Sequence, residues 1–94
     1  MAKLVIAPAA RQDLSDIFDF IARDKPVAAA QWVDTIEQKC TLIATTPAFG
    51  EKRPEYGDNI RSSHVGRYVI FFRPIEHGIE VVRVIAGDRD VRSL

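Results

Sequence analysis

Residues 64–74 read HVGRYVIFFRP and contain the turn and the strand on which the rest of the predicted fold depends. Gly66-Arg67 is a two-residue connection whose leading glycine suits a type II′ turn, because that turn needs a positive φ at its first central position. Residues 60–65 predict a strand with one solvent-exposed face, and residues 68–73 predict an aromatic strand that ends at Pro74. The sequence therefore predicts an antiparallel β-hairpin.

One more strand is predicted downstream of this hairpin. Glu76-His77-Gly78 predicts a turn, and residues 79–86 (IEVVRVIA) carry apolar side chains on both faces, as in a central strand that is covered on both sides. Arg83 interrupts the apolar row of this strand, so its guanidinium needs a carboxylate, carbonyl oxygens or water. The carboxylates expected within reach at the edge of the sheet are Glu80, Asp88 and Asp90.

A short strand and two helices are predicted upstream. Residues 3–7 predict the strand, after which Pro8 suits the first helical position. Asp24-Lys25-Pro26 separates the helices, with Asp24 as the expected cap and Pro26 in the first turn of the second helix. Apolar side chains at helical spacing form one stripe in each helix: Leu14, Ile17, Phe18 and Ile21 in the first, and Ala29, Trp32, Val33, Ile36, Cys40 and Ile43 in the second.

The predicted order of elements is β-α-α-β-β-β. This is an α+β fold in which a helical hairpin packs on a small, mainly antiparallel sheet. The segment EKRPEYGDN, residues 51–59, predicts a polar loop between the helices and the hairpin. With 94 residues and no repeats, the chain predicts a single domain over residues 1–94.

Composition and motifs exclude several classes of function. The formal net charge is zero, which argues against a general nucleic-acid coat or a binder of anionic membranes. The sequence has no glycine-rich phosphate loop, no GxSxG and no HExxH, so it predicts no cofactor. Asp13, Asp16 and Asp19 recur every three residues, and a solvated helix face is favoured over a metal site for them.

The lone cysteine and the apolar runs bear on the compartment. Cys40 lies in an apolar stripe, so we expect a buried, inert thiol in a reducing environment. Its spacing from His64 and His77 fits no usual zinc site, and the sequence predicts no metal. No apolar run reaches the roughly 18 residues of a membrane span, and the N-terminal residues lack a signal-peptide layout. The prediction is a cytoplasmic, soluble protein.

Arginines are concentrated in the second half of the chain, where seven of the nine lie. A planar guanidinium recognises carboxylates and phosphates, so this concentration indicates a recognition surface; solvated arginines on a strand-rich half are the alternative. An exposed array of arginines can bind RNA or an acidic helical peptide. The residues predicted to bind a partner are Arg53, Arg61, Arg67, Arg73, Arg83 and Arg89.

Strand alternation predicts how the side chains around these arginines are shared between the two faces of the sheet. Tyr68, Ile70 and Phe72 should point one way, and Val69, Phe71 and Arg73 the other. On the preceding strand, Arg61 should share its face with Ser63 and Val65. The aromatic run is therefore predicted to be mostly core, with the guanidinium groups around it as the candidate recognition surface.

An ordered set of motifs resembles a known toxin family. The motifs are Pro8 followed by Asp13-Leu14, Leu42-(x)4-Pro47-(x)2-Gly50, Ile60-Arg61-Ser62, VGRYVIFFR at residues 65–73 and VIAGDRD at residues 84–90. Together they resemble the ParE branch of the ParE/RelE superfamily, the toxins of bacterial type II toxin–antitoxin pairs. The resemblance implies the β-α-α-β-β-β fold, inhibition of DNA gyrase with a block of replication, a role in plasmid stabilisation, and a hetero-oligomer with a ParD-like antitoxin.

Two other functions remain open within that superfamily. RelE-like members are ribosome-dependent mRNA endoribonucleases, and for this alternative the resemblance implies Arg61, His64, Tyr68 and Arg89 as catalytic candidates. Residues 90–94 (DVRSL) contain neither the tyrosine nor the histidine that such nucleases use near the C-terminus, which favours a toxin that is not itself a catalyst. A non-toxic module that only binds an antitoxin is the second alternative.

The antitoxin also has a physical rationale. The edge of a small sheet attracts unwanted strands unless something covers it. We expect an antitoxin to lay an amphipathic helix and an extended segment across the helical hairpin and the sheet, with acidic side chains meeting the arginines.

Overall fold

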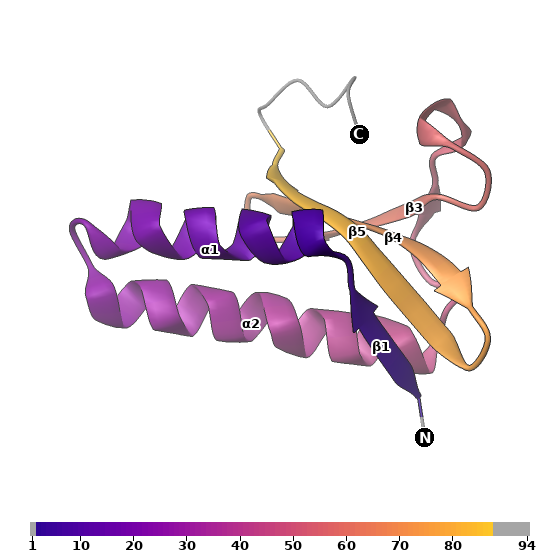
Figure 1. Ribbon diagram of the computed structural model, residues 1–94, viewed down its shortest axis with the longest axis horizontal. Coiled ribbons are helices and arrows are strands. Elements are labelled where there is room, and N and C mark those ends of the chain that lie inside the picture. The colour runs from indigo at the N-terminus through magenta and orange to yellow at the C-terminus, as the bar shows by residue number, and fades with distance from the viewer. Residues whose placement is uncertain (1, 88–94) are drawn as a thin grey trace.

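A computed structural model describes residues 2–87, which form two helices on one face of a five-stranded sheet (Figure 1). The predicted α+β order of elements is confirmed, with a short additional strand after the helices. The helices are α1 (Pro8–Ala22) and α2 (Pro26–Thr45). The strands are β1 (Lys3–Ile6), β2 (Glu51–Lys52), β3 (Arg61–Val65), β4 (Tyr68–Ile75) and β5 (Gly78–Ala86).

The sheet has the order β1-β5-β4-β3-β2, so the first and last strands of the described chain are neighbours. They pair in parallel, whereas the other neighbours pair antiparallel, which confirms a mainly antiparallel sheet. Gly78 lies opposite Lys3 in this parallel pair. A Cβ atom on Gly78 would collide with the main chain of Lys3, so the close approach of β1 to β5 requires glycine there.

The β3–β4 hairpin turns at Gly66-Arg67 as predicted. Gly66 has a φ of 58°, the positive value that a type II′ turn needs at its first central position. A Cβ atom here would collide with the indole of Trp32 on α2, so the turn packs directly against that helix. Trp32 also meets Tyr68 edge to face, with ring centroids 5.8 Å apart. The start of the aromatic strand is thereby fixed to the helical layer.

The core lies between the helices and one face of the sheet. It joins Leu14 of α1 and the stripe of α2 to side chains from β4 and β5. The second-helix stripe is confirmed, because its members are buried or half-buried. In the first stripe, Phe18 is an exception: 38% of its surface is exposed, and Ala10 is the residue that packs fully into the core instead. Phe18 lies in the C-terminal half of α1, the half nearer the turn between the two helices, and that turn projects beyond the sheet (Figure 1).

A β-bulge corrects the predicted face pattern of β5. Phe71 pairs with Arg83 but Phe72 pairs with Val81, so Val82 is an extra residue without a counterpart on β4. After the bulge, Val84 takes the core position that strict alternation assigns to Arg83. The apolar row of β5 therefore continues without interruption, and the arginine lies outside it.

The breaks around the helices also differ in detail from the prediction. The residue that precedes α2 as its cap is Lys25, not Asp24, and no side chain caps that helix. Pro8 and Pro26 do open their helices as expected. The segment predicted as a loop, residues 51–59, contains β2 and a 3₁₀ turn, Pro54–Tyr56.

This segment covers the face of the sheet that points away from the helices. Tyr56 meets Phe71 edge to face, with ring centroids 5.4 Å apart, and Phe71 is only 3% exposed. The face without helices therefore has its own small apolar contact. Within residues 2–87, neither helix has the length and apolarity to cross a bilayer.

Candidate partner-binding surface

The structure places the predicted arginines on different faces of the sheet rather than on one surface. The described members are Arg53, Arg61, Arg67, Arg73 and Arg83, while Arg89 lies outside the described residues. Each described member has intramolecular contacts, and the nature of those contacts determines how much charge it can offer to a partner.

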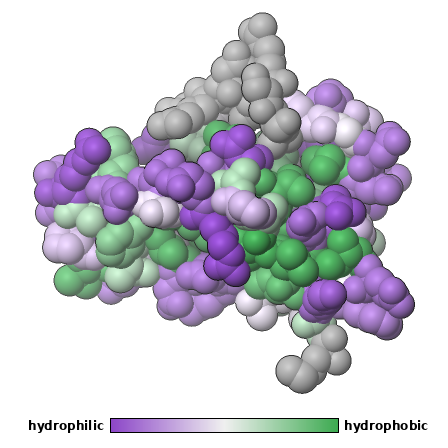
Figure 2. Space-filling view, viewed as in Figure 1, coloured by the Kyte–Doolittle hydropathy of each residue, from purple (hydrophilic) through white to green (hydrophobic). Residues whose placement is uncertain are grey.

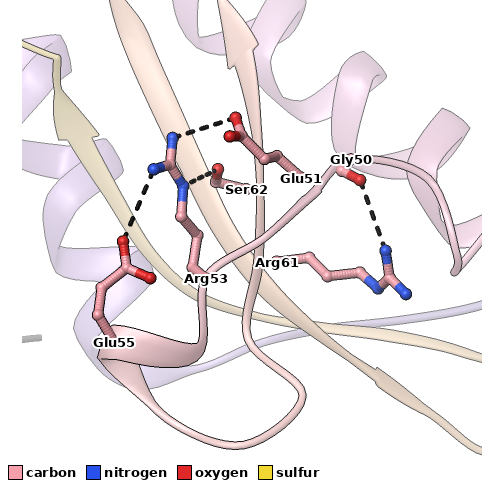
Figure 3. Close-up of polar contacts among 6 residues, drawn as sticks. All are labelled: Gly50, Glu51, Arg53, Glu55, Arg61 and Ser62. Carbon is pink, nitrogen blue, oxygen red and sulfur yellow. Dashed lines mark hydrogen bonds and ion pairs between the residues drawn. The ribbon is translucent and has the colours of Figure 1, made fainter.

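Arg53 is bound within the segment that covers the outer face (Figure 3). Its guanidinium donates a 2.9 Å hydrogen bond to the buried hydroxyl of Ser62, and its nitrogens lie 3.3 Å from Glu51 and 3.7 Å from Glu55. Two carboxylates on exposed side chains therefore neutralise this charge. The contacts fasten residues 51–56 to β3 and make Arg53 a structural side chain in the free protein.

Arg61 points away from Arg53 and binds main-chain carbonyls (Figure 3). Its guanidinium donates to the carbonyl oxygens of Ala48 and Gly50, at 3.0 and 3.5 Å. The register places Arg61 opposite Phe72, on the helix-facing side, and Arg61 shares this face with Ser63 and Val65 as predicted. No carboxylate among the described residues pairs with Arg61, so its positive charge is not neutralised within them.

Arg73 and Glu80 face each other across β4 and β5 on the outer face of the sheet. The guanidinium Nε donates a 2.7 Å hydrogen bond to the Glu80 carboxylate. Nearly half of the arginine side chain remains exposed, so the pair is accessible to solvent and to a partner.

Arg83 forms a bidentate ion pair with a carboxylate on α1. Its guanidinium donates two hydrogen bonds to the carboxylate of Asp13 on α1, at 2.7 and 2.9 Å. These bonds raise the pKa of Arg83 above its ordinary value, while partial burial opposes them. The sequence-based expectation of Glu80 as its partner is wrong, since Glu80 pairs with Arg73, and the other two expected partners, Asp88 and Asp90, lie outside the described residues. The expected solvated role of Asp13 is wrong too, because its side chain is only 12% exposed.

Two of the arginines meet at a groove between α1 and the C-terminal part of β5. The groove has a volume of about 620 Å³. Its lining includes Arg67, Arg83, Tyr68 and Val84, and Phe20 of α1 contributes an aromatic ring that is 65% exposed. Figure 2 shows hydrophobic surface over the sheet and near the turn of the helical hairpin.

The three described candidates for a ribonuclease site, Arg61, His64 and Tyr68, do not converge; Arg89 lies outside the described residues. His64 pairs with Val69 on the outer face, whereas Tyr68 pairs with Val65 on the helix-facing side. Tyr68 is buried against Trp32, and Arg61 is bound to carbonyls at the opposite end of β3. Among residues 2–87, no three histidine, cysteine, aspartate or glutamate side chains are grouped to hold a metal ion.

One surface was missed by reasoning from the sequence. Leu42 and Phe49 are 59% and 50% exposed, and the ammonium group of Lys39 lies 5.2 Å from the centroid of the Phe49 ring. The sequence contained one signal of this surface: Leu42 lies off the core stripe of α2 and has no predicted place in the core. The orientation of Phe49 after the helix could not be predicted.

Comparisons with known proteins agree with this architecture. A family model described as the ParE toxin of the type II toxin–antitoxin system parDE matches residues 4–91. A solved structure from the chromosomal ParDE toxin–antitoxin system of P. aeruginosa matches with a TM-score of 0.77 and 21% identity. That match covers 92% of this chain and 96% of the other, and at this identity it supports the fold.

No curated protein sequence matches the chain. The family model extends over nearly the whole sequence, from β1 past the end of β5. The fold found independently in the solved ParDE structure is the same arrangement of two helices on a mixed sheet. The chain therefore belongs to the ParE toxin family of type II toxin–antitoxin systems.

Proposed function

We propose that this ParE toxin inhibits DNA gyrase, and that a ParD-like antitoxin encoded with it neutralises that activity by forming a hetero-oligomer. The observation that carries the proposal is the family match over residues 4–91. On this proposal the protein acts by fitting a surface of the topoisomerase and not by catalysing a reaction.

The geometry of the arginines supports a binding role. A ribonuclease must hold a general base, a general acid and phosphate-stabilising cations around one phosphodiester. Here His64 and Tyr68 point to opposite faces of the sheet, and the guanidinium of Arg61 is already bound to carbonyl oxygens. The described side chains of the ribonuclease alternative are therefore poorly arranged to act on one substrate.

The six predicted arginines remain proposed contacts for the antitoxin, and the internal contacts of four of them allow a ranking. A carboxylate that binds Arg53, Arg73 or Arg83 must compete with one already in place, so the net gain is small. Arg61 has no such competitor among the described residues. Among these four arginines, Arg61 is the proposed contact with the largest expected contribution.

Parallel activity assays test the proposal. Purified toxin should inhibit supercoiling by gyrase and increase the amount of cleaved DNA, and equimolar antitoxin should restore supercoiling. The same preparation is added to ribosomes translating a defined mRNA. Cleavage of that mRNA with unchanged supercoiling would overturn the proposal in favour of a RelE-like ribonuclease. Inactivity in both assays, without growth arrest on expression, would leave a non-toxic antitoxin-binding module.

A further inference from the structure

A small exposed surface near the end of α2 combines apolar side chains with unneutralised positive charge. We call it the Phe49 platform and define it as Lys39, Leu42, Phe49 and Arg61. Half of the Phe49 surface and more than half of the Leu42 surface are exposed. The ammonium group of Lys39 lies 5.2 Å from the Phe49 ring centroid, within the range of a cation–π contact. Leu42 lies one helical turn beyond Lys39 on the same side of α2.

The segment that carries Phe49 is fixed against the sheet. The Phe49 N–H donates to the carbonyl of Thr46 at 2.8 Å, and Arg61 binds the carbonyls on both sides of Phe49. Gly50 follows with a φ of 92°, and a Cβ atom there would lie 2.7 Å from the Ser62 carbonyl oxygen. These contacts hold the ring outward before any partner arrives. Such preorganisation lowers the entropy lost on binding.

The charge around the platform differs from that around three of the arginines predicted to bind a partner. Arg53, Arg73 and Arg83 each pair with a carboxylate. Arg61 binds only carbonyl oxygens, and no carboxylate among residues 2–87 pairs with Lys39. Two positive charges therefore flank two exposed apolar side chains. A complementary partner presents carboxylates around a large apolar side chain.

We propose that the Phe49 platform is the docking site for an acidic, apolar segment of the antitoxin. This inference rests on the proposed function, since it assigns a place to the antitoxin. A second copy of the chain is a poor occupant, because a symmetric contact through this patch would bring like charges together. The exposed ring of Phe49 is the expected anchor, and Lys39 and Arg61 attract the flanking carboxylates.

Calorimetric titration with the purified ParD-like antitoxin tests the platform. Phe49→Ala should weaken binding at least tenfold, as expected for loss of an aromatic anchor. Lys39→Glu should weaken it by a similar factor and reduce its dependence on salt. Two matched controls lie elsewhere: Val27→Ala removes an exposed apolar side chain from the start of α2, and Lys25→Glu reverses an exposed charge at the hairpin turn. Both controls should bind within about twofold of wild type. Thermal unfolding establishes that each variant is folded.

The outcomes separate this inference from the proposed function. If wild type binds the antitoxin but Phe49→Ala and Lys39→Glu bind equally well, the platform is wrong and the toxin–antitoxin pairing stands. If Phe49→Ala keeps its antitoxin affinity but loses inhibition of gyrase, the platform belongs to gyrase and the inference is overturned. If wild type itself forms no complex, both proposals are overturned.

Discussion

Asp13 and Arg83, which are 70 positions apart in the sequence, form a two-pronged ion pair that joins α1 to β5. The same carboxylate accepts a 2.9 Å hydrogen bond from the main-chain N–H of Val84. The pairing of β1 with β5 ends at Val81, so the main chain of β5 has no β1 partner at Val84. The carboxylate of Asp13 accepts the hydrogen bond there instead. One side chain thus fastens a helix to the sheet beside the bulge.

Replacing Asp13 by Asn should therefore destabilise the protein. The change removes the charge that pairs with a half-buried guanidinium and weakens the bond to Val84, which we expect to cost about 2 kcal/mol. For a domain of this size the melting temperature should fall by roughly 8–16 °C. Urea unfolding measures the loss. Arg73→Ala is the control, because its more exposed pair with Glu80 should contribute less than about 1 kcal/mol. Equal losses in the two variants would contradict this account.

Gly78→Ala should disrupt the parallel pair of β1 and β5. The new Cβ atom would occupy space taken by the main chain of Lys3, so β1 must move away, at an expected cost of at least about 2 kcal/mol. Gly87→Ala is the matched control, since its Cβ atom would lie 3.2 Å from its nearest neighbour, the Arg67 carbonyl oxygen, and should change stability by less than about 1 kcal/mol. Chemical denaturation of both variants measures these changes. An unchanged free energy of unfolding in Gly78→Ala would show that the pairing of β1 contributes little to stability.

Cys40 should make stability depend on pH in alkaline solution. Burial, with a smaller contribution from Glu37, raises the pKa of this thiol from 9.0 to about 11. Between those values the unfolded chain loses the thiol proton while the folded protein keeps it, so the free energy of unfolding should fall as pH rises. The contribution is about 2–3 kcal/mol by pH 11. Urea titrations of wild type and Cys40→Ala from pH 8 to 11 measure the difference in slope, and parallel curves would rule out this effect.

Arg53→Ala should release the segment that covers the outer face without unfolding the protein. The ion pairs that it loses are partly exposed, so global stability should change by about 1 kcal/mol or less. Amide exchange in residues 53–60 should nevertheless accelerate several-fold, while β4 and β5 keep their protection. Lys52→Ala, an exposed neighbour, provides the control for native-state hydrogen exchange. Unchanged exchange in Arg53→Ala would show that the Tyr56–Phe71 contact holds the segment by itself.

Arg61→Glu and Arg73→Glu should both weaken the antitoxin complex, with the larger effect at Arg61. Reversal at Arg61 introduces repulsion where the positive charge was unneutralised, and it also releases the carbonyls around Phe49. Reversal at Arg73 places a second carboxylate opposite Glu80, and Arg73→Ala separates that internal repulsion from a lost contact. Titration calorimetry measures the affinities. Unchanged binding in both charge-reversed variants would exclude this part of the arginine set from the interface.

The sequence was sufficient for the order of elements because its local signals agree with its tertiary contacts. Proline opens both helices, the α2 stripe recurs at helical spacing, and Gly66 provides the positive φ of the hairpin turn. The core face of β4 also followed from alternation. These features depend on residues near one another in the chain.

The partners of the charged side chains could not be predicted in the same way. Asp13 binds Arg83 because a bulge at Val82 turns the strand and because α1 lies along β5, and neither fact has a local signature. The hydrogen bonds from Arg61 to the carbonyls beside Phe49 likewise depend on the path of the chain between α2 and β3. The candidate binding surface was therefore only partly accessible from the sequence, since it depends on contacts between distant segments.

The pairing of β1 with β5 also has a consequence for synthesis on the ribosome. The first strand emerges early but finds its neighbour only when residues 78–81 have left the exit tunnel. Until then, the apolar side chains of β1 and of the helical hairpin lack β5, the strand against which they pack in the folded protein. Pairing between segments so far apart in the sequence is also slow to form. A nascent toxin should thus stay incomplete, and harmless, until translation of the described strands is finished.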